Sequence, residues 1–157
     1  MFPLNELPQT INYDTFKSCL KKIKMEFFKN LNTIVETLEN EERVLFAYLY
    51  GSVAAGEKGN DIDIAVFSAT DADPHKLSAD LKVDLHKKTD IAPDSFDVRI
   101  LNTLVEGGDI FDLLYLRNVL KAGKILVDKN PKVRGDFLER YGTRFRECEG
   151  LMQEVLA

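Results

Sequence analysis

The sequence contains few of the features that mark membrane-spanning, secreted or zinc-binding proteins. Its two cysteines, Cys19 and Cys148, form no CxxC pair and have no histidine-rich surroundings, which disfavours a zinc site and predicts reduced thiols packed on helices. The longest apolar run, Val44–Tyr50, is far shorter than the roughly 20 residues that a membrane span needs. The first ten residues show no signal peptide pattern, so we expect a cytoplasmic protein without a membrane segment.

An excess of positive charge is also missing. The 157 residues carry 21 Lys and Arg against 26 Asp and Glu, a net charge of -5, which disfavours broad binding of nucleic acid. Hydrophobic residues make up 45% of the chain, an ordinary value for a folded protein. The length fits a single domain with a substantial core.

Helical and strand patterns alternate along the chain. A helical apolar stripe predicts a helix over residues 13–38 with a break near Asn30 to Asn32, and short apolar or alternating runs predict strands at 44–50, 61–67, 96–101 and 124–127. Further helices are expected at 74–88, at 110–120 ending by Gly123, and from Asn130-Pro131 to the end. The last has the stripe Val133, Phe137, Tyr141, Phe145, Cys148 and Leu151. The fold class is therefore α/β or α+β, a small mixed sheet of about four strands covered by helices.

Acidic residues interrupt two of the apolar strands. Asp61 and Asp63 stand two positions apart, so on a strand they point to one face while Ile62 and Ile64 face the core. Two close carboxylates repel each other unless a cation lies between them, and oxygen ligands favour Mg²⁺ or Mn²⁺. Asp97 on the next strand completes a candidate shared site. His75 and His86, near the two ends of one helix, are expected to be surface residues without a catalytic role.

A glycine-serine turn precedes the acidic strand. Gly51-Ser52 ends the first strand, and glycine together with a serine hydroxyl suits close contact with phosphate oxygens. The combined pattern, Tyr48-Leu49-Tyr50-Gly51-Ser52, eight residues, then Asp61-Ile62-Asp63 and later Asp97, resembles the GS…DxD signature of the DNA polymerase β nucleotidyltransferase superfamily. Over about residues 44 to 140 the chain is similar to the minimal nucleotidyltransferases. Among these it resembles MntA-type antitoxins, which transfer AMP from ATP to a tyrosine of a partner HEPN-domain (HepT) toxin.

This resemblance implies a role for each of the residues that match the family pattern. Asp61, Asp63 and Asp97 are the expected catalytic residues and ligands of two Mg²⁺ ions, while Gly51 and Ser52, with Lys58 supplying positive charge, would bind the triphosphate. ATP and a HEPN toxin are the implied partners. The implied organisation is one nucleotidyltransferase domain over 1–157, with a helical extension at 1–40, a catalytic core at 43–128 and a C-terminal helix at 130–157.

Other functions stay open at this stage. Val53-Ala54-Ala55 stand where such antitoxins usually carry arginines, which suits a catalytically degenerate antitoxin that acts by contact alone. Transfer to a small molecule is a further alternative, although such enzymes generally need an additional substrate domain. Transfer to RNA is disfavoured by the negative charge and by the lack of an aromatic and basic platform.

Overall fold

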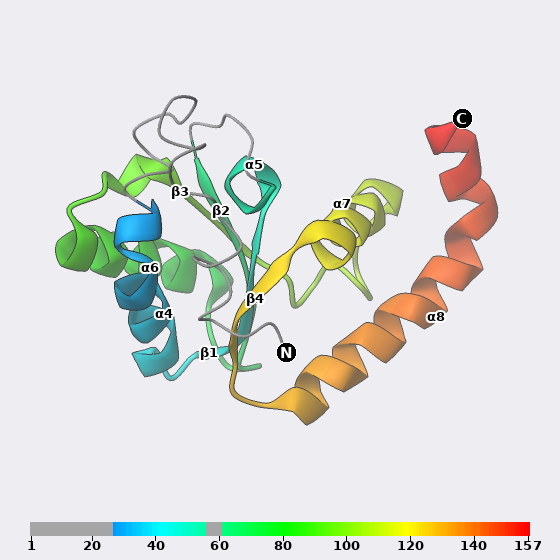
Figure 1. Ribbon diagram of the computed structural model, residues 1–157. Coiled ribbons are helices and arrows are strands. Elements are labelled where there is room, and N and C mark those ends of the chain that lie inside the picture. The colour runs from blue at the N-terminus through cyan, green and yellow to red at the C-terminus, as the bar shows by residue number, and fades with distance from the viewer. Residues whose placement is uncertain (1–26, 56–60) are drawn as a thin grey trace.

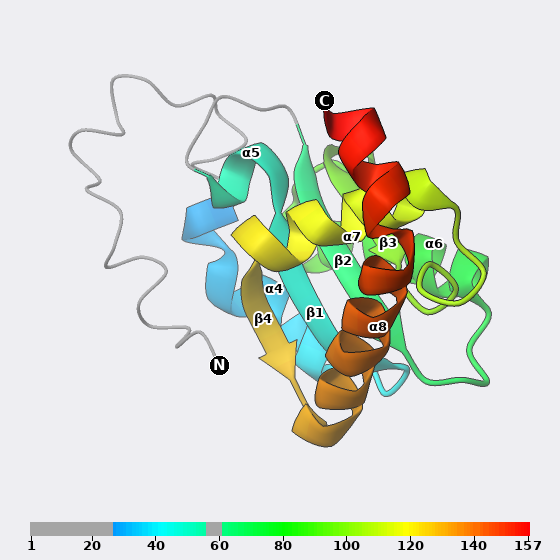
Figure 2. The same ribbon diagram turned by 90° about the vertical axis from the view of Figure 1, so that its right-hand side faces the viewer.

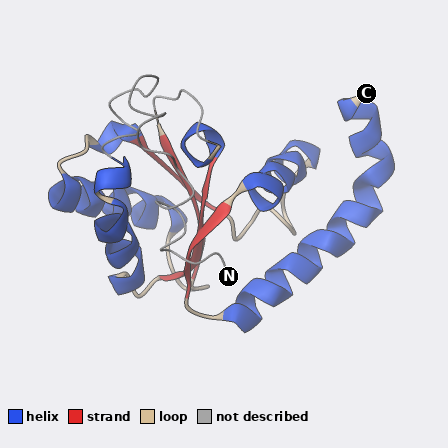
Figure 3. Ribbon diagram, viewed as in Figure 1, coloured by secondary structure: helices blue, strands red, loops and turns tan. Residues whose placement is uncertain are grey.

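The computed structural model describes residues 27–55 and 61–157, which form a sheet with helices on both faces (Figure 1). The elements are α4 (Leu31–Asn40), β1 (Val44–Tyr50), α5 (Gly51–Ala54), β2 (Ile62–Ser68), α6 (Pro74–Thr89), the 3-10 helix η1 (Pro93–Ser95), β3 (Phe96–Ile100), α7 (Ile110–Ala122), β4 (Lys124–Asp128) and α8 (Pro131–Leu156). Figure 3 shows the strands together in the centre and the helices outside them. The expected fold class is confirmed.

The sheet has the strand order β3-β2-β1-β4. β1 is antiparallel to both of its neighbours, whereas β2 and β3 are parallel. A parallel pair needs a crossover connection, and α6 supplies it. In Figure 1, α4 and α6 lie on one side of the sheet and α7 and α8 on the other. The two carboxylate-bearing strands are therefore direct neighbours that run in the same direction.

The core on the α4 and α6 side is aliphatic. Ile62 and Ile64 of β2 are fully buried and share this core with Leu77 and Leu81 of α6. The period of two in β2 and the period of about four in α6 bring these residues to one interface. This burial confirms that the residues alternating with Asp61 and Asp63 face the core.

The opposite core is aromatic and holds α8 against the sheet. Phe46 of β1 and Phe67 of β2 stack with ring centroids 4.8 Å apart, and Phe137 of α8 lies 5.5 Å from Phe46. The predicted stripe of α8 is wrong at its end, because Leu151 is 60% exposed whereas Met152 is buried. The last two steps of the predicted stripe are three residues each and fall about 60° short of a full turn, whereas the seven residues from Phe145 to Met152 make nearly two full turns, so Met152 follows the buried face. Figure 2 shows α8 crossing the molecule in front of the sheet.

The side chains just before α6 and α8 cap the first turns of those helices. Asp73 accepts hydrogen bonds from the backbone N–H groups of His75 and Lys76 at 2.9 and 3.0 Å, and Asn130 accepts one from Val133 at 3.2 Å. The predicted break near Asn30 is confirmed, since a turn there separates a helical segment at 27–29 from α4. α4 ends at Asn40, two residues later than predicted.

Three sequence predictions concern residues outside the described ranges: the helix over 13–26, the packing of Cys19 and the phosphate contact of Lys58. Cys148 is a free, partly buried thiol on α8, as expected. Among the described helices, none combines the length and the apolar character that crossing a membrane requires.

Candidate active site

A row of polar side chains crosses three adjacent strands at one end of the sheet. Tyr50 of β1 is paired with Asp63 of β2, and Asp63 is in turn the register partner of Asp97 on β3. Neighbouring register partners point to the same face of a sheet. The pairing therefore brings the two aspartates together from positions 34 residues apart in the chain, as the sequence pattern predicted.

Asp61 lies at the open end of the same face. It is exposed just before β2 begins, while Asp63 is half-buried and Asp97 is exposed. Burial, followed by the charges of Asp97 and Asp61, raises the pKa of Asp63 to about 6. The three predicted carboxylates thus share one electrostatic environment, in which the charge on Asp63 is unfavourable.

The donor set fits a hard divalent cation. Within the described residues, no hydrogen bond or ion pair from the protein reaches the carboxylates of Asp61, Asp63 or Asp97. No group of three His, Cys, Asp or Glu side chains in this part of the chain forms a complete ligand cluster. Mg²⁺ commonly uses one or two carboxylates and completes its shell with water and substrate phosphates, so it does not need such a cluster. The residues fit the ion that the sequence predicted.

Gly51 forms the contact between the glycine-serine turn and the carboxylates. Its φ of +74° lies in the left-handed region, which glycine adopts at little cost. A Cβ built at this position would overlap Oδ2 of Asp63. Two features therefore require glycine at this position: the left-handed backbone conformation and the close approach of the Asp63 carboxylate.

Replacing Gly51 by Ala is expected to lower the free energy of unfolding by about 1–3 kcal/mol, because an L residue is strained at this φ and its methyl group displaces Asp63. Thermal or urea unfolding measures the loss. Gly135→Ala on α8 is the matched control, since a Cβ there meets nothing within 4 Å and should stabilise the helix by about 0.5–1 kcal/mol. Equal effects of the two substitutions would contradict this role of Gly51.

Ser52 lies in the short helix α5, beside the carboxylates but without a basic neighbour on that helix. Ser52 is partly buried, and Val53 is fully buried in the aliphatic core. Val53 and Ala54 thus pack against the core, Ala55 is exposed, and an arginine in place of Val53 would have to be buried. The side chains of α5 therefore offer no positive charge to an anionic ligand.

An arginine and two tyrosines next to the aspartates were not predicted as site residues. The Arg99 guanidinium lies 4.0 Å from the ring centroid of Tyr115 and donates to Asp112 at 3.0 Å. The rings of Tyr50 and Tyr115 meet edge to face at 5.4 Å. Burial, with smaller effects from Asp97 and Asp63, raises the pKa of Tyr50 to about 12.

Only part of this aromatic cluster left a signal in the sequence. Tyr50 directly precedes Gly51, and Arg99 follows Asp97 by two positions, so both could have been placed on the site's face by strand alternation. Tyr115 comes from α7, and its position depends on how that helix packs.

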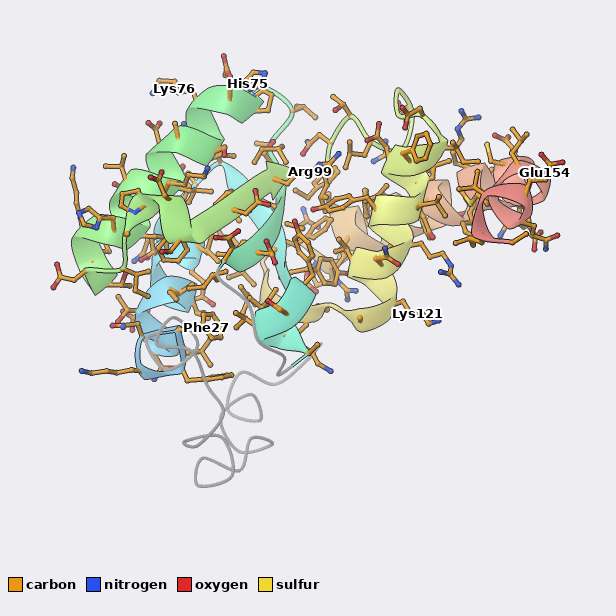
Figure 4. The ribbon with its side chains drawn as sticks, turned by 90° about the horizontal axis from the view of Figure 1, so that it is seen from above. Phe27, His75, Lys76, Arg99, Lys121 and Glu154 are labelled. Carbon is orange, nitrogen blue, oxygen red and sulfur yellow. The ribbon has the colours of Figure 1, made fainter. Side chains whose placement is uncertain are left out.

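The two histidines lie away from these residues. His75 is exposed at the start of α6, and Figure 4 shows it next to Lys76 at the edge of the molecule, well apart from Lys121. His86 donates from Nδ1 to the carbonyl oxygen of Ile91 at 3.0 Å. Neither histidine reaches the carboxylates, so no general base is available from that residue type among the described residues.

The mixed sheet, the carboxylate row and the glycine-serine turn together define a nucleotidyltransferase. Residues 32–132 match the sequence model of the family described as polymerase beta, nucleotidyltransferase. This match covers more than half of the chain, so the protein belongs to that family, and the resemblance stated from the sequence is confirmed. A search of curated proteins gave no significant match.

Several solved structures share the fold at low sequence identity. A chain from a mutant MntA toxin–antitoxin complex aligns with a TM-score of 0.56 and 21% identity, over 82% of this chain and 99% of that one. A toxin–antitoxin structure with AMP-PNP aligns with a TM-score of 0.56 and 24% identity, over 82% of this chain and 99% of that chain. A chain from a complex of tri-AMPylated Shewanella oneidensis HEPN toxin with MNT antitoxin aligns with a TM-score of 0.52 and 23% identity, over 82% of this chain and 97% of that chain. At these identities the likeness establishes the fold.

Proposed function

We propose that this nucleotidyltransferase transfers AMP from ATP to a tyrosine hydroxyl of a HEPN-domain toxin and so acts as an antitoxin. The observation that carries the proposal is the row formed by Asp63 and Asp97, with Asp61 beside it and Gly51 against Asp63. Phosphoryl and nucleotidyl transfer require positioning and charge neutralisation more than covalent chemistry, and this row provides the anionic end of such a site.

Each residue has a part in this proposal. Asp61, Asp63 and Asp97 would hold two Mg²⁺ ions, or Mn²⁺ in their place, and Gly51 and Ser52 would contact the triphosphate together with Lys58. The ions, when bound, neutralise the phosphates and polarise the α-phosphate. Asp97 is exposed, so it is accessible to an incoming hydroxyl and can accept its proton.

The reaction balances without a further reactant. The acceptor oxygen forms a bond to the α-phosphorus of ATP, and the bond from that phosphorus to the bridging oxygen of the β-phosphate breaks. Pyrophosphate leaves with the electron pair, and the hydroxyl proton passes to the Asp97 carboxylate. The products are an AMP-modified protein and pyrophosphate.

The choice of acceptor draws on the similar structures. One of them contains an AMPylated HEPN toxin with its MNT antitoxin, and another contains AMP-PNP. We therefore take ATP as the nucleotide donor of this chain and a HEPN toxin as its partner.

We also propose that residues 1–157 form one domain, with an extension at 1–40, a core at 43–128 and a final helix at 130–157, and that the protein is cytoplasmic.

Labelling with base-labelled ATP tests the proposal. The purified protein, Mg²⁺ and labelled ATP are mixed with lysate of the source organism, and protein bands are examined for label. We expect one small labelled protein, with AMP on tyrosine by mass spectrometry and no label when Asp61 and Asp63 are both replaced by Asn. Absence of protein label despite measurable ATP binding would contradict a protein acceptor and favour a small molecule.

A contact-only antitoxin is the second candidate. It is favoured by the absence of any basic residue in α5, where Val53 is buried. It predicts that the protein binds and inhibits its toxin equally well with and without ATP and Mg²⁺. The labelling experiment separates the two, since a contact-only antitoxin labels nothing.

A further inference from the structure

A short strip of side chains leads away from Asp97 at the edge of the sheet. β3 is the outer strand in the order β3-β2-β1-β4, and Arg99 follows Asp97 by two positions, so both side chains lie on the same face. Arg99 reaches α7, where its guanidinium lies 4.0 Å from the ring centroid of Tyr115 and Nη2 donates to Asp112 at 3.0 Å. In the view of Figure 4, Arg99 lies between α6 and α7.

An exposed phenylalanine continues the strip. Phe111, in the first turn of α7, is 66% exposed. It precedes Tyr115 by four positions, a spacing that makes two side chains neighbours on a helix surface. A single exposed apolar side chain is ordinary on a protein, so Phe111 matters here because it adjoins the arginine. We call Arg99, Phe111, Asp112 and Tyr115 the Arg99 strip.

The guanidinium of Arg99 has unused binding capacity. It carries five N–H donors, and within the described residues it makes one hydrogen bond, to Asp112. The Arg99 side chain is 41% exposed, which leaves room for a second anionic partner. The ring of Tyr115 and the ion pair with Asp112 hold the group in place before a ligand arrives, and such ordering lowers the entropy cost of binding.

Arg99 and Asp97 act on the same neighbouring hydroxyl. Burial raises the pKa of Tyr50 to about 12, and among the smaller influences the charge of Asp97 raises this pKa whereas the charge of Arg99 lowers it. The two charged groups therefore lie close enough to share one ligand.

A hollow of about 530 Å³ elsewhere on the surface is less suited to select a charged partner. It lies between the segment after β3 and α8, and none of the three carboxylates lines it. Its arginines are paired within the chain, Arg140 with Glu106 at 2.8 Å and Arg144 with Glu147 at 3.5 Å.

We infer that the Arg99 strip binds the segment of the acceptor protein that carries the modified tyrosine, an inference that rests on the proposed function. The strip fits a segment that presents an Asp or Glu to the guanidinium and an apolar side chain to Phe111. A carboxylate accepts two parallel hydrogen bonds from a guanidinium, so this contact gives direction as well as affinity. Asp97 and Arg99 stand about 6.6 Å apart along the strand, which is the length of two residues of an extended peptide. We therefore expect the acidic residue of the acceptor within about two positions of its tyrosine.

Two synthetic peptides test the inference. Each contains one tyrosine with leucines beside it, and the positions two residues before and after the tyrosine are glutamate in one peptide and lysine in the other. Transfer of AMP from labelled ATP with Mg²⁺ is measured for both. We expect kcat/KM for the glutamate peptide to exceed that for the lysine peptide about tenfold or more, because only the glutamates pair with Arg99.

Variants of the strip connect this preference to its residues. Arg99→Gln should abolish the preference by raising the KM of the glutamate peptide, whereas Arg99→Lys should retain part of it because a cation remains. Phe111→Ser should raise the KM of both peptides about fivefold, since an apolar contact is lost. ATP binding with Mg²⁺ should stay unchanged in all three variants, which a general loss of structure would not allow.

Matched controls lie outside the strip. Arg140→Gln removes an arginine of similar exposure, 46%, that is also ion-paired, and Val83→Ser removes an apolar side chain of α6 that is 45% exposed on the other side of the sheet. Neither substitution should change the KM of either peptide.

Each outcome assigns the failure. If the two peptides are labelled equally, or if Arg99→Gln and Phe111→Ser behave like the controls, the inference is overturned and the proposed function stands. If a lysate protein is labelled but neither peptide is, recognition needs other surfaces and the inference is again overturned. If Arg99→Gln loses ATP binding together with transfer, the arginine serves the nucleotide and the inference fails. If the wild type binds ATP but labels neither peptide nor any lysate protein, the proposed function fails and the inference fails with it.

Discussion

Replacing Asp63 by Asn is expected to reduce nucleotidyl transfer about a thousandfold or more, because the site loses the central carboxylate of its row and with it several kcal/mol of charge stabilisation. The initial rate of AMP incorporation at saturating Mg²⁺ measures the loss. Asp84→Asn on α6, which lies against the other face of the sheet, should leave the rate unchanged. An Asp63→Asn variant with wild-type, metal-dependent activity would refute the assignment.

The same substitution is expected to stabilise the metal-free protein at neutral pH. Burial, then Asp97 and Asp61, raises the pKa of Asp63 to about 6, so the folded protein binds this proton more tightly than the unfolded chain does. The ionised group therefore opposes folding above that pKa. Since the side chain is half-exposed and screened by solvent, we expect a gain of about 1 kcal/mol at pH 7.

The sign of the pH dependence gives a second check. With a chelator present to remove metal, the free energy of unfolding of the wild type should rise as the pH falls from about 7 through 6, because Asp63 becomes protonated. The higher stability of Asp63→Asn should disappear below about pH 4, where Asp63 is protonated in both the folded and the unfolded chain. Mg²⁺ should raise the Tm of the wild type and leave that of the variant nearly unchanged. A variant less stable than the wild type at pH 7 without metal would contradict the unfavourable charge.

Arg134→Met is expected to lower the free energy of unfolding by about 3–5 kcal/mol, because it leaves a buried carboxylate without its partner. Arg134 of α8 donates from Nε to Oδ2 of Asp128 at 2.8 Å, and the Asp128 side chain is 2% exposed. Oδ1 of Asp128 has no hydrogen-bond partner among the described residues. The pair joins β4 to α8 at the point where the long helix leaves the sheet.

A surface pair provides the comparison for this prediction. Arg140 and Glu106 lie at a similar distance, 2.8 Å, but their side chains are 46% and 70% exposed. Arg140→Met should therefore cost about 0–1 kcal/mol in the same urea unfolding experiment. If the two methionine variants unfold at the same urea concentration, the buried pair does not hold α8 in place.

Local patterns predicted the elements because each is fixed by chemistry close in the sequence. The run Val44–Tyr50 is apolar and too short for a helix, and it forms β1 over those residues. Asp73-Pro74 predicted the start of α6, since the aspartate accepts backbone N–H groups and proline fits the first turn. An error arose at Leu151, where two successive steps of three residues turned the predicted stripe away from the buried face of the long helix.

The carboxylates were predictable to different degrees. Strand alternation alone places Asp61 and Asp63 on one face, away from the core. Asp97 could be suspected from its place on an apolar strand, but its nearness to Asp63 depends on the parallel register of β2 and β3, which neither strand shows by itself. That register depends on which faces of the two strands are buried together, so it is decided only when the sheet assembles with its helices.

The sequence by itself determined the class of the protein, because the glycine-serine turn and the Asp-Ile-Asp strand are short segments whose residue types and spacing match the family pattern. Tertiary structure alone decided what surrounds them. It brought Tyr115, Asn118 and Lys121 of α7 beside Gly51, and it buried Val53, so that α5 offers no cation. The positions of these side chains follow from packing two helix layers against one sheet, and the free energy of that packing depends on every core residue.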